Sequence, residues 1–144
     1  MKPPARPLTL TKTEAALRQI SAAIEAFAVG DFDIAVTLAG AAEGAIIDPP
    51  PTSQVVLIKN LPAGIERAGG KKEWNRSINQ TRDWLKHVTT DLPNAIVVQR
   101  SDAAFQIARA LIKLQAVHTW DDLRMEEFRV WITEYIDRLD EPAA

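Results

Sequence analysis

Arg82 and His87 lie five positions apart in the segment 82–87 (RDWLKH), within a stretch that has the hydrophobic period of a helix. An arginine can stabilise a phosphate group through paired hydrogen bonds, and a histidine can accept or donate a proton near neutral pH. Together the two side chains could stabilise a phosphate group and move a proton. Short patterns of this kind also arise by chance, so the surrounding fold has to decide whether this segment has a function.

Residues 71–88 divide into an apolar and a polar half when they are projected onto a helix at about 100° per residue. The expected buried stripe contains Trp74, Ile78, Thr81, Leu85 and Val88. The polar half contains Arg76, Asn79, Asp83, Lys86 and His87, with Arg82 at its border. Asp83 precedes His87 by four positions, so its carboxylate can orient the imidazole.

Two interpretations of this polar half remain open. In the first, Arg82, His87 and Asp83 are catalytic, and the ligand is bound by Asn79, Lys86 and Arg76. In the second, the same residues form an ordinary solvated helix surface with a weak contact between Asp83 and His87.

Composition limits the classes of protein to which this chain can belong. Its 144 residues, 47% hydrophobic and 25% charged, can form one compact domain with a core. The absence of Cys excludes disulfides, thiolate catalysis and Cys-based zinc sites, and two His residues provide no obvious metal cluster. We therefore expect no metal and no cofactor. A net charge of −2 provides no overall basic field, so any contact with RNA has to be local.

Residues 1–10 are rich in proline and are expected to form a flexible N-terminal arm. They lack the apolar core of a secretory signal. No run in the chain approaches the roughly 18–20 apolar residues that cross a bilayer. The sequence therefore predicts a cytoplasmic protein that does not associate with membranes.

Residues 11–140 are expected to form a helical bundle, because apolar residues recur there at steps of three and four. A first helix is expected to begin after Thr11 or Thr13, with Glu14 completing a capping box from Thr11. It ends at Gly30, and Asp31 caps the second helix. The residues expected to face inward are Leu17, Ile20, Ala23, Ile24 and Phe27 in the first helix, Ala35, Leu38, Ala39, Ala42 and Ile46 in the second, Ala104, Ile107, Ala108, Leu111 and Leu114 in a helix capped by Asp102, and Phe128, Trp131, Ile132, Tyr135, Ile136 and Leu139 in the last.

Small residues crowd the second helix between positions 40 and 45. A glycine inside a helix costs about 0.5–1 kcal/mol relative to alanine, so Gly40 and Gly44 are expected to permit the close approach of a neighbour. The proline run 49–51 ends this helix.

The segment 53–69 is the least clear. Val55–Ile58 has the composition of a strand, but no second strand candidate exists to pair with it. We therefore expect a helix interrupted near Pro62 and separated by Gly69 and Gly70 from the helix 71–88. The predicted fold class is an all-α, single-domain bundle of five to six helices.

Three further side chains have specific expectations. Glu43 is expected to be partly exposed or, if it is buried, to pair with a Lys or Arg of the helix 71–88. His118 lies at a helix end, where it can favour the helix dipole. Trp84 lies between the apolar stripe and His87, and a large apolar side chain there should meet another surface. We therefore expect a homodimer through the helix that carries Trp84.

With these residues in view, the chain resembles the HEPN superfamily of small helical-bundle proteins. The usual HEPN motif is an Arg, often followed by Asn, Asp or His, and then a His after a gap of four to six residues; residues 82–87 match it, with Asp83 in second place. The segments 38–43 and 77–82 also resemble bacterial HEPN-like proteins of unknown role. The resemblance covers roughly residues 11 to 118.

The resemblance implies a metal-independent endoribonuclease that acts as a homodimer, with the two motifs meeting in one cleft. His87 then transfers a proton at the ribose 2′-OH or the leaving oxygen, Arg82 holds the scissile phosphate, and Asp83 orients His87 or the motif. Some HEPN proteins paired with nucleotidyltransferases have Tyr two positions after the His, where this chain has Thr89, which argues against that toxin–antitoxin version. The alternative is a non-catalytic HEPN-like module that dimerises or binds a ligand or partner.

Overall fold

The computed structural model describes residues 1–47, 62–87, 93–119 and 122–135. In these ranges the chain forms six helices and no strand: α1 (Lys12–Ala28), α2 (Phe32–Ala45), α4 (Pro62–Ala68), α5 (Lys71–Lys86), α6 (Arg100–Gln115) and α7 (Leu123–Tyr135). The prediction of an all-α helical bundle is confirmed. None of the described helices combines the length and the apolar character that crossing a membrane requires. The predictions for Val55–Ile58, Val88, Thr89, Ile136 and Leu139 lie outside the described residues.

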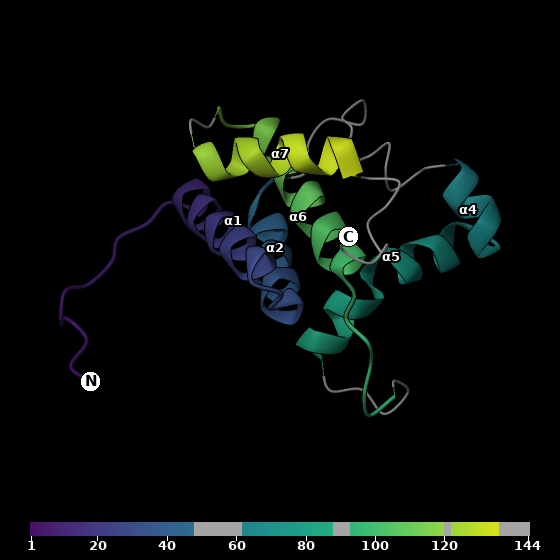
Figure 1. Cartoon of the computed structure of the whole chain (residues 1–144), viewed down its shortest axis with the longest axis horizontal. Helices are drawn as coiled ribbons and strands as arrows, with labels where there is room; N and C mark the ends of the chain where they lie inside the picture. Colours follow the sequence, from purple (N-terminus) through teal and green to yellow (C-terminus); the bar gives the residue numbers. More distant parts are fainter. Residues whose placement is uncertain (48–61, 88–92, 120–121, 136–144) are drawn as a thin grey trace.

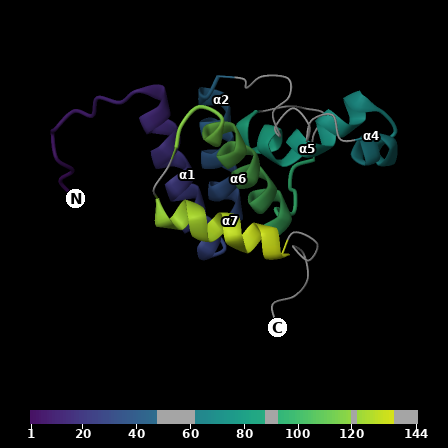
Figure 2. The same ribbon diagram turned by 90° about the horizontal axis from the view of Figure 1, so that it is seen from above.

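α1, α2 and α6 pack against one another and form the body of the molecule, and α7 lies across α1 and α6 (Figures 1 and 2). α5 contacts this body mainly through α2 and also bonds to Arg109 of α6, and α4 packs on α5. Both views show α4 and the adjoining part of α5 extending away from α1. The N-terminal arm projects from the opposite side of the body. Its residues 1–10 form no regular structure and are all exposed.

The first helix begins where its capping residues predict. The Thr11 hydroxyl accepts a hydrogen bond from the Glu14 backbone N–H at 3.1 Å, and the Glu14 carboxylate accepts one from the Thr11 N–H at 2.8 Å. This reciprocal pair settles the choice between Thr11 and Thr13 in favour of Thr11. After α1 the chain turns at Gly30, whose φ of 87° lies in the left-handed region that glycine adopts without strain.

The core consists mostly of alanine and medium-sized aliphatic residues from α1, α2 and α6. Because alanine side chains are short, these three helices can approach one another closely. Met125 and Phe128 of α7 cover one part of this core. The buried apolar residues are Ala16, Ile20, Ala23, Ile24, Ala26, Ala35, Val36, Ala39, Ala42, Ile46, Ala103, Ala104, Ile107, Ala110, Leu111, Leu114, Met125 and Phe128. Most of the residues expected to face inward in these helices are among them or pack against them.

Two local predictions are wrong. Asp102 does not cap α6 but lies inside its first turn, where its carboxylate accepts a hydrogen bond from the Gln99 N–H at 2.8 Å; Gln99 is the N-cap. The second error concerns α5, which has no fully buried residue. Its expected apolar stripe, at Trp74, Ile78 and Leu85, is only half-buried, because polar residues beside that stripe also face the body.

Candidate functional site

Arg82 and His87 lie at the C-terminal end of α5. Lys86 is the last helical residue, and His87 is the C-cap with an extended backbone (φ −123°, ψ 138°). The His87 backbone N–H still donates to the Asp83 carbonyl at 2.9 Å. Its side chain is exposed and makes no hydrogen bond or ion pair within the described parts of the chain. The imidazole is therefore open to solvent.

Asp83 pairs with its neighbour Arg82 and not with His87, contrary to the prediction. The Arg82 Nε and Nη2 atoms both donate to Asp83 Oδ1 at 3.3 Å. Because His87 follows the helix with an extended backbone, it leaves the helical position at which a residue four places after Asp83 would face that carboxylate. In this arrangement Asp83 can orient the guanidinium but does not orient the imidazole.

Arg82 is held by a buried glutamate of α2. Glu43 is only 4% exposed, and its Oε2 atom lies 3.6 Å from Arg82 Nη1. This contact fulfils the expectation that a buried Glu43 pairs with a cation of α5. Gly40, one turn earlier in α2, provides the room for it, because a Cβ atom at Gly40 would lie 2.9 Å from Cδ of Arg82. The expectation of close approach is thus confirmed at Gly40. At Gly44 a Cβ atom would meet nothing within 4 Å.

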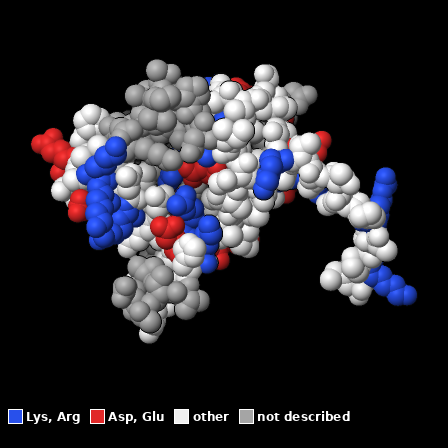
Figure 3. Space-filling view, turned by 180° about the vertical axis from the view of Figure 1, so that it is seen from behind, with Lys and Arg blue, Asp and Glu red and all other residues white. Residues whose placement is uncertain are grey.

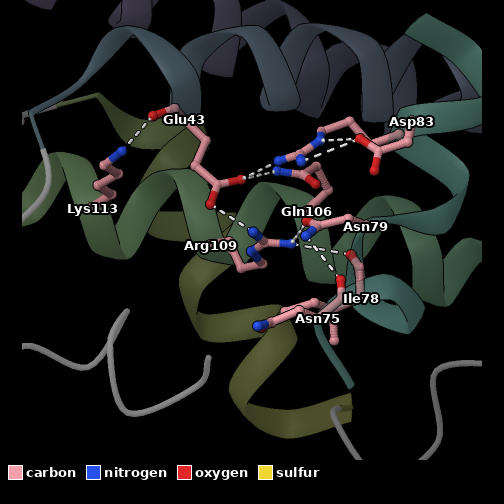
Figure 4. Close-up of polar contacts among 9 residues, drawn as sticks. Glu43, Asn75, Ile78, Asn79, Asp83, Gln106, Arg109 and Lys113 are labelled. Carbon is pink, nitrogen blue, oxygen red and sulfur yellow. Dashed lines mark hydrogen bonds and ion pairs between the residues drawn. The ribbon is translucent and has the colours of Figure 1, made fainter. Parts of the chain in front are cut away.

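The closest partners of Glu43 come from α6, and the sequence analysis did not identify them (Figure 4). Arg109 Nη2 donates to Glu43 Oε1 at 2.8 Å, and Gln106 Nε2 donates to Oε2 at 2.5 Å. Lys113 Nζ donates to the Glu43 backbone carbonyl at 2.8 Å. We call Glu43, Arg82, Gln106, Arg109 and Lys113 the Glu43 cluster. The signal that could have revealed it is the spacing of Gln106, Arg109 and Lys113, which places three polar residues on one side of the otherwise apolar stretch 103–114.

Asn79 belongs to this interior and not to the solvent-facing half where the helical projection placed it. Its Oδ1 atom accepts a hydrogen bond from Arg109 Nη1 at 3.0 Å, and the Ile78 carbonyl accepts another from the same nitrogen at 3.1 Å. The Asn79 amide also donates to the Asn75 carbonyl at 2.9 Å. Arg109 therefore joins α2 to α5, and Asn79 is already engaged in holding the fold.

Burial of Arg109 has an electrostatic cost that Glu43 offsets in part. The side chain is 2% exposed, and this burial lowers the pKa of the guanidinium, while the neighbouring Glu43 carboxylate raises it. Arg82 is a second cation nearby and lowers the pKa further. Arg109 Nε is buried without a hydrogen-bond partner in the described structure. The cluster thus holds more positive than negative charge around one carboxylate.

The other two predicted ligand-binding residues remain at the surface. Arg76 and Lys86 are exposed on α5. Figure 3 shows basic side chains gathered on one face at the end formed by α4 and α5, together with acidic ones. Arg76 and Lys86 are therefore accessible to a ligand, whereas Asn79 faces the body.

Trp84 is half-buried by its own chain. Its indole Nε1 donates to the Pro93 carbonyl at 2.7 Å, and the side chain lines a small cavity of about 290 Å³ together with Phe32 and Leu85. Residues of the same chain therefore cover part of the indole, so a second chain is not required to cover all of it.

Within the described ranges no group of three or more His, Asp or Glu residues could hold a metal ion. Comparison of this chain with protein-family models, with curated proteins and with solved structures finds no match.

Proposed function

We propose that this protein is a metal-independent endoribonuclease of the HEPN type that acts as a homodimer, with Arg82 and His87 as its catalytic residues. The observation that carries the proposal is the contrast between these two side chains. Arg82 is held by the buried Glu43, whereas the His87 imidazole is exposed and makes no polar contact with the described residues. Phosphate binding requires a group fixed in position, and proton transfer requires a group that can exchange protons.

Arg82 can bind a phosphate group once Asp83 moves aside. The bonds between them are 3.3 Å long, and the Asp83 side chain is 47% exposed. Exposed pairs of this kind contribute only about 0–1 kcal/mol, so a phosphodiester can compete for Nε and Nη2 with two oxygens. Glu43 remains beside Nη1 and continues to hold the guanidinium. Before the substrate binds, Asp83 holds the Nε and Nη2 atoms of Arg82 in position.

The proposed reaction is an attack of the ribose 2′-oxygen on phosphorus. One His87 accepts the proton of the 2′-OH as the new oxygen–phosphorus bond forms. The bond from phosphorus to the 5′-oxygen breaks, and a second, protonated His87 donates a proton to the leaving oxygen. The products end in a 2′,3′-cyclic phosphate and a 5′-hydroxyl. Since each chain has one such histidine, a dimer supplies both the base and the acid.

The first test compares wild-type protein with His87→Ala and His118→Ala on a panel of single-stranded RNAs in the presence of EDTA. His118 is the matched control, because it is also exposed but lies after the end of α6. We expect His87→Ala to lower the cleavage rate by roughly 10²- to 10⁴-fold and His118→Ala to leave it unchanged. Unchanged cleavage in His87→Ala would contradict the assignment.

The second test replaces Arg82 by lysine. This variant keeps a positive charge beside Glu43 but loses the paired hydrogen bonds to phosphate. We expect the cleavage rate to fall by roughly 10²-fold, because the developing phosphate charge loses its stabilising donors. The melting temperature should stay close to that of the wild type, which distinguishes a lost catalytic contact from a lost fold.

The proposed dimer contact is on α5, where Trp84 leaves part of its indole exposed. Two copies of α5 related by a two-fold axis bring two His87 residues and two Arg82 residues to one interface. Light scattering at high micromolar concentration tests this arrangement. A monomer at that concentration, or a dimer that an α5 substitution such as Trp84→Arg does not affect, contradicts it.

A non-catalytic binding module is the second candidate, and the charge around Arg82 favours it. The guanidinium faces two carboxylates, Glu43 and Asp83, close to the negative end of the α5 dipole. This arrangement reduces the attraction for a phosphate group. A wild-type protein that dimerises while leaving the whole RNA panel intact would support this second function.

A further inference from the structure

We propose that a groove between α1, α2 and α7 binds the N-terminal arm, residues 1–10, of a second copy of this chain. The groove encloses about 730 Å³ and is lined by Phe27, Phe32, Phe128 and Trp131. The ring centroid of Phe27 lies 5.7, 5.6 and 5.2 Å from those of the other three rings, respectively. Phe27, Phe32 and Trp131 are partly exposed, and the buried Phe128 packs against Phe27 and Trp131. We call the surface that they form the aromatic groove.

Among the residues that the structure describes, the rim of the aromatic groove has one carboxylate without a partner. Of its charged residues, Arg124 forms an ion pair with Glu25 and also contacts Ser21, and Arg100 has an interaction partner of its own. Glu127 is exposed and makes no hydrogen bond or ion pair with the described residues. The rim therefore presents a carboxylate, that of Glu127, which pairs with no residue in the described part of the chain, beside an aromatic surface.

The arm has the complementary chemistry. Pro4 and Pro7 form a Pro-x-x-Pro pattern that includes Arg6, and the arm contains no acidic residue. Leu8 is 70% exposed and has no apolar cover from its own body. Figure 3 shows the arm standing away from the body with basic side chains on it. Proline-rich segments favour the extended polyproline II conformation and dock in aromatic-lined grooves, where basic residues can pair with acidic rims.

The arm cannot place both prolines in the groove of its own chain. The groove begins at Ile24, which lies about 20 Å from Thr11 along α1 at 1.5 Å per residue. Pro7 precedes Thr11 by four residues, and four residues span at most about 14 Å when fully extended. Pro7 and Leu8 therefore cannot reach it, whereas the arm of another copy has no such restriction. Two copies can exchange arms, each binding in the groove of the other.

The first experiment titrates a synthetic peptide with the sequence of residues 1–10 into the full chain carrying Arg6→Glu, and follows backbone amide resonances. The substitution weakens the receiving protein's own arm as a competitor. We expect saturable shifts at groove positions such as Ala28, Gly30 and Glu127. A peptide in which Pro4 and Pro7 are both replaced by serine should bind roughly tenfold more weakly, because it loses the preformed extended conformation. Absent shifts, or shifts confined to another surface, overturn the proposal.

The second experiment exchanges the charges. Glu127→Lys in the full chain should weaken binding of the wild-type peptide by roughly threefold to fivefold, as expected for an exposed ion pair replaced by a repulsion. A peptide carrying Arg6→Glu should recover that affinity on the Glu127→Lys protein. Glu134→Lys is the matched control, since Glu134 is an exposed glutamate of α7 that does not line the groove. Equal weakening by Glu134→Lys would overturn the specific pairing.

The third measurement distinguishes exchange between copies from occupation by the protein's own arm. In the wild-type chain, the groove resonances should move toward their peptide-bound positions as concentration rises from low micromolar to millimolar. Resonances already at those positions and unchanged on dilution, in a protein that light scattering shows to be a monomer, mean that the arm binds within its own chain. That result overturns exchange between copies.

Discussion

α6 contacts the rest of the protein through two stripes of opposite chemistry. The first stripe packs in the core against α1 and α2 and consists of Ala103, Ala104, Ile107, Ala110, Leu111 and Leu114. The second, formed by Gln106, Arg109 and Lys113, is just as buried but is polar. The apolar stripe is satisfied by any well-packed apolar surface, whereas the polar stripe requires acceptors at defined positions. Here Glu43 supplies most of them.

The polar stripe also determines how the helix with the candidate catalytic residues is attached. α5 contributes no fully buried residue to the core. Arg109 donates to Ile78 and Asn79 of α5, and Glu43 pairs with Arg82. The position of Arg82 therefore depends more on hydrogen bonds and charge than on apolar packing. Removing the buried Glu43 carboxylate should therefore affect both the stability of the fold and the candidate site.

The largest effect is expected for Glu43→Ala. Removing the carboxylate leaves Arg109 buried without its counter-charge, and breaking such a pair from one side costs about 3–5 kcal/mol. Urea unfolding measures this loss in the free energy of unfolding. Glu134→Ala, at an exposed glutamate of α7, is the control and should change it by less than about 0.5 kcal/mol.

A double variant sharpens the comparison of the two stripes. Replacing both members of the buried pair, with Glu43→Leu and Arg109→Met, removes the unpaired charge and should recover most of the stability lost in Glu43→Ala. Unfolding of Glu43→Ala at nearly the wild-type urea concentration would contradict the contrast between the two stripes. It would mean that the polar stripe of α6 does not depend on the Glu43 carboxylate.

An intermediate effect is expected at the two glycines of α2. Gly40→Ala places a methyl group against Arg82, whose guanidinium is held by Glu43 and Asp83, so we expect a loss of about 1 kcal/mol. Gly44→Ala meets no neighbouring atom and should stabilise the helix by about 0.5–1 kcal/mol. Thermal unfolding of both variants measures the difference. Equal shifts in the same direction would show that Arg82 does not occupy the space above Gly40.

The smallest effect is expected for the exposed ion pair of α7. Arg129 donates two hydrogen bonds to Glu126, and they lower the pKa of this carboxyl below its ordinary value of 4.5. The folded state therefore binds this proton less tightly than the unfolded state. The contribution of the pair is present above pH 4.5 and is lost as the pH falls through the lowered pKa.

Melting temperatures of the wild type and Glu126→Gln from pH 7 down to pH 3 test this sign. The wild type should be slightly more stable at neutral pH, and the difference should shrink in acid. A difference that grows as the pH falls would contradict the assignment. Glu126 and Glu43 differ in their exposure to solvent. Water screens the exposed pair on α7, whereas the pair between Glu43 and Arg109 is almost completely buried.

Helix positions were largely predictable because their causes are local. Thr11 and Glu14 cap α1 through bonds that span three residues, and Gly69 and Gly70 separate α4 from α5 as expected. The cap of α6 was misassigned because Asp102 is suited to capping and also to the first turn of a helix. The candidate site was predicted less well. Arg76 and Lys86 are exposed as predicted, and Arg82 is partly exposed. Asp83 and Asn79, however, bond to Arg82 and Arg109, and spacing along one helix did not reveal these partners.

The sequence by itself determined that this chain forms a set of helices with apolar stripes, since periodicity and capping depend on residues within a few positions of one another. Only the tertiary structure decided which polar residues face inward. Glu43 bonds to Gln106, Arg109 and Lys113, which are 63, 66 and 70 positions away in the chain. A buried charge is tolerable only beside its partners, and which partners reach it depends on how the helices pack.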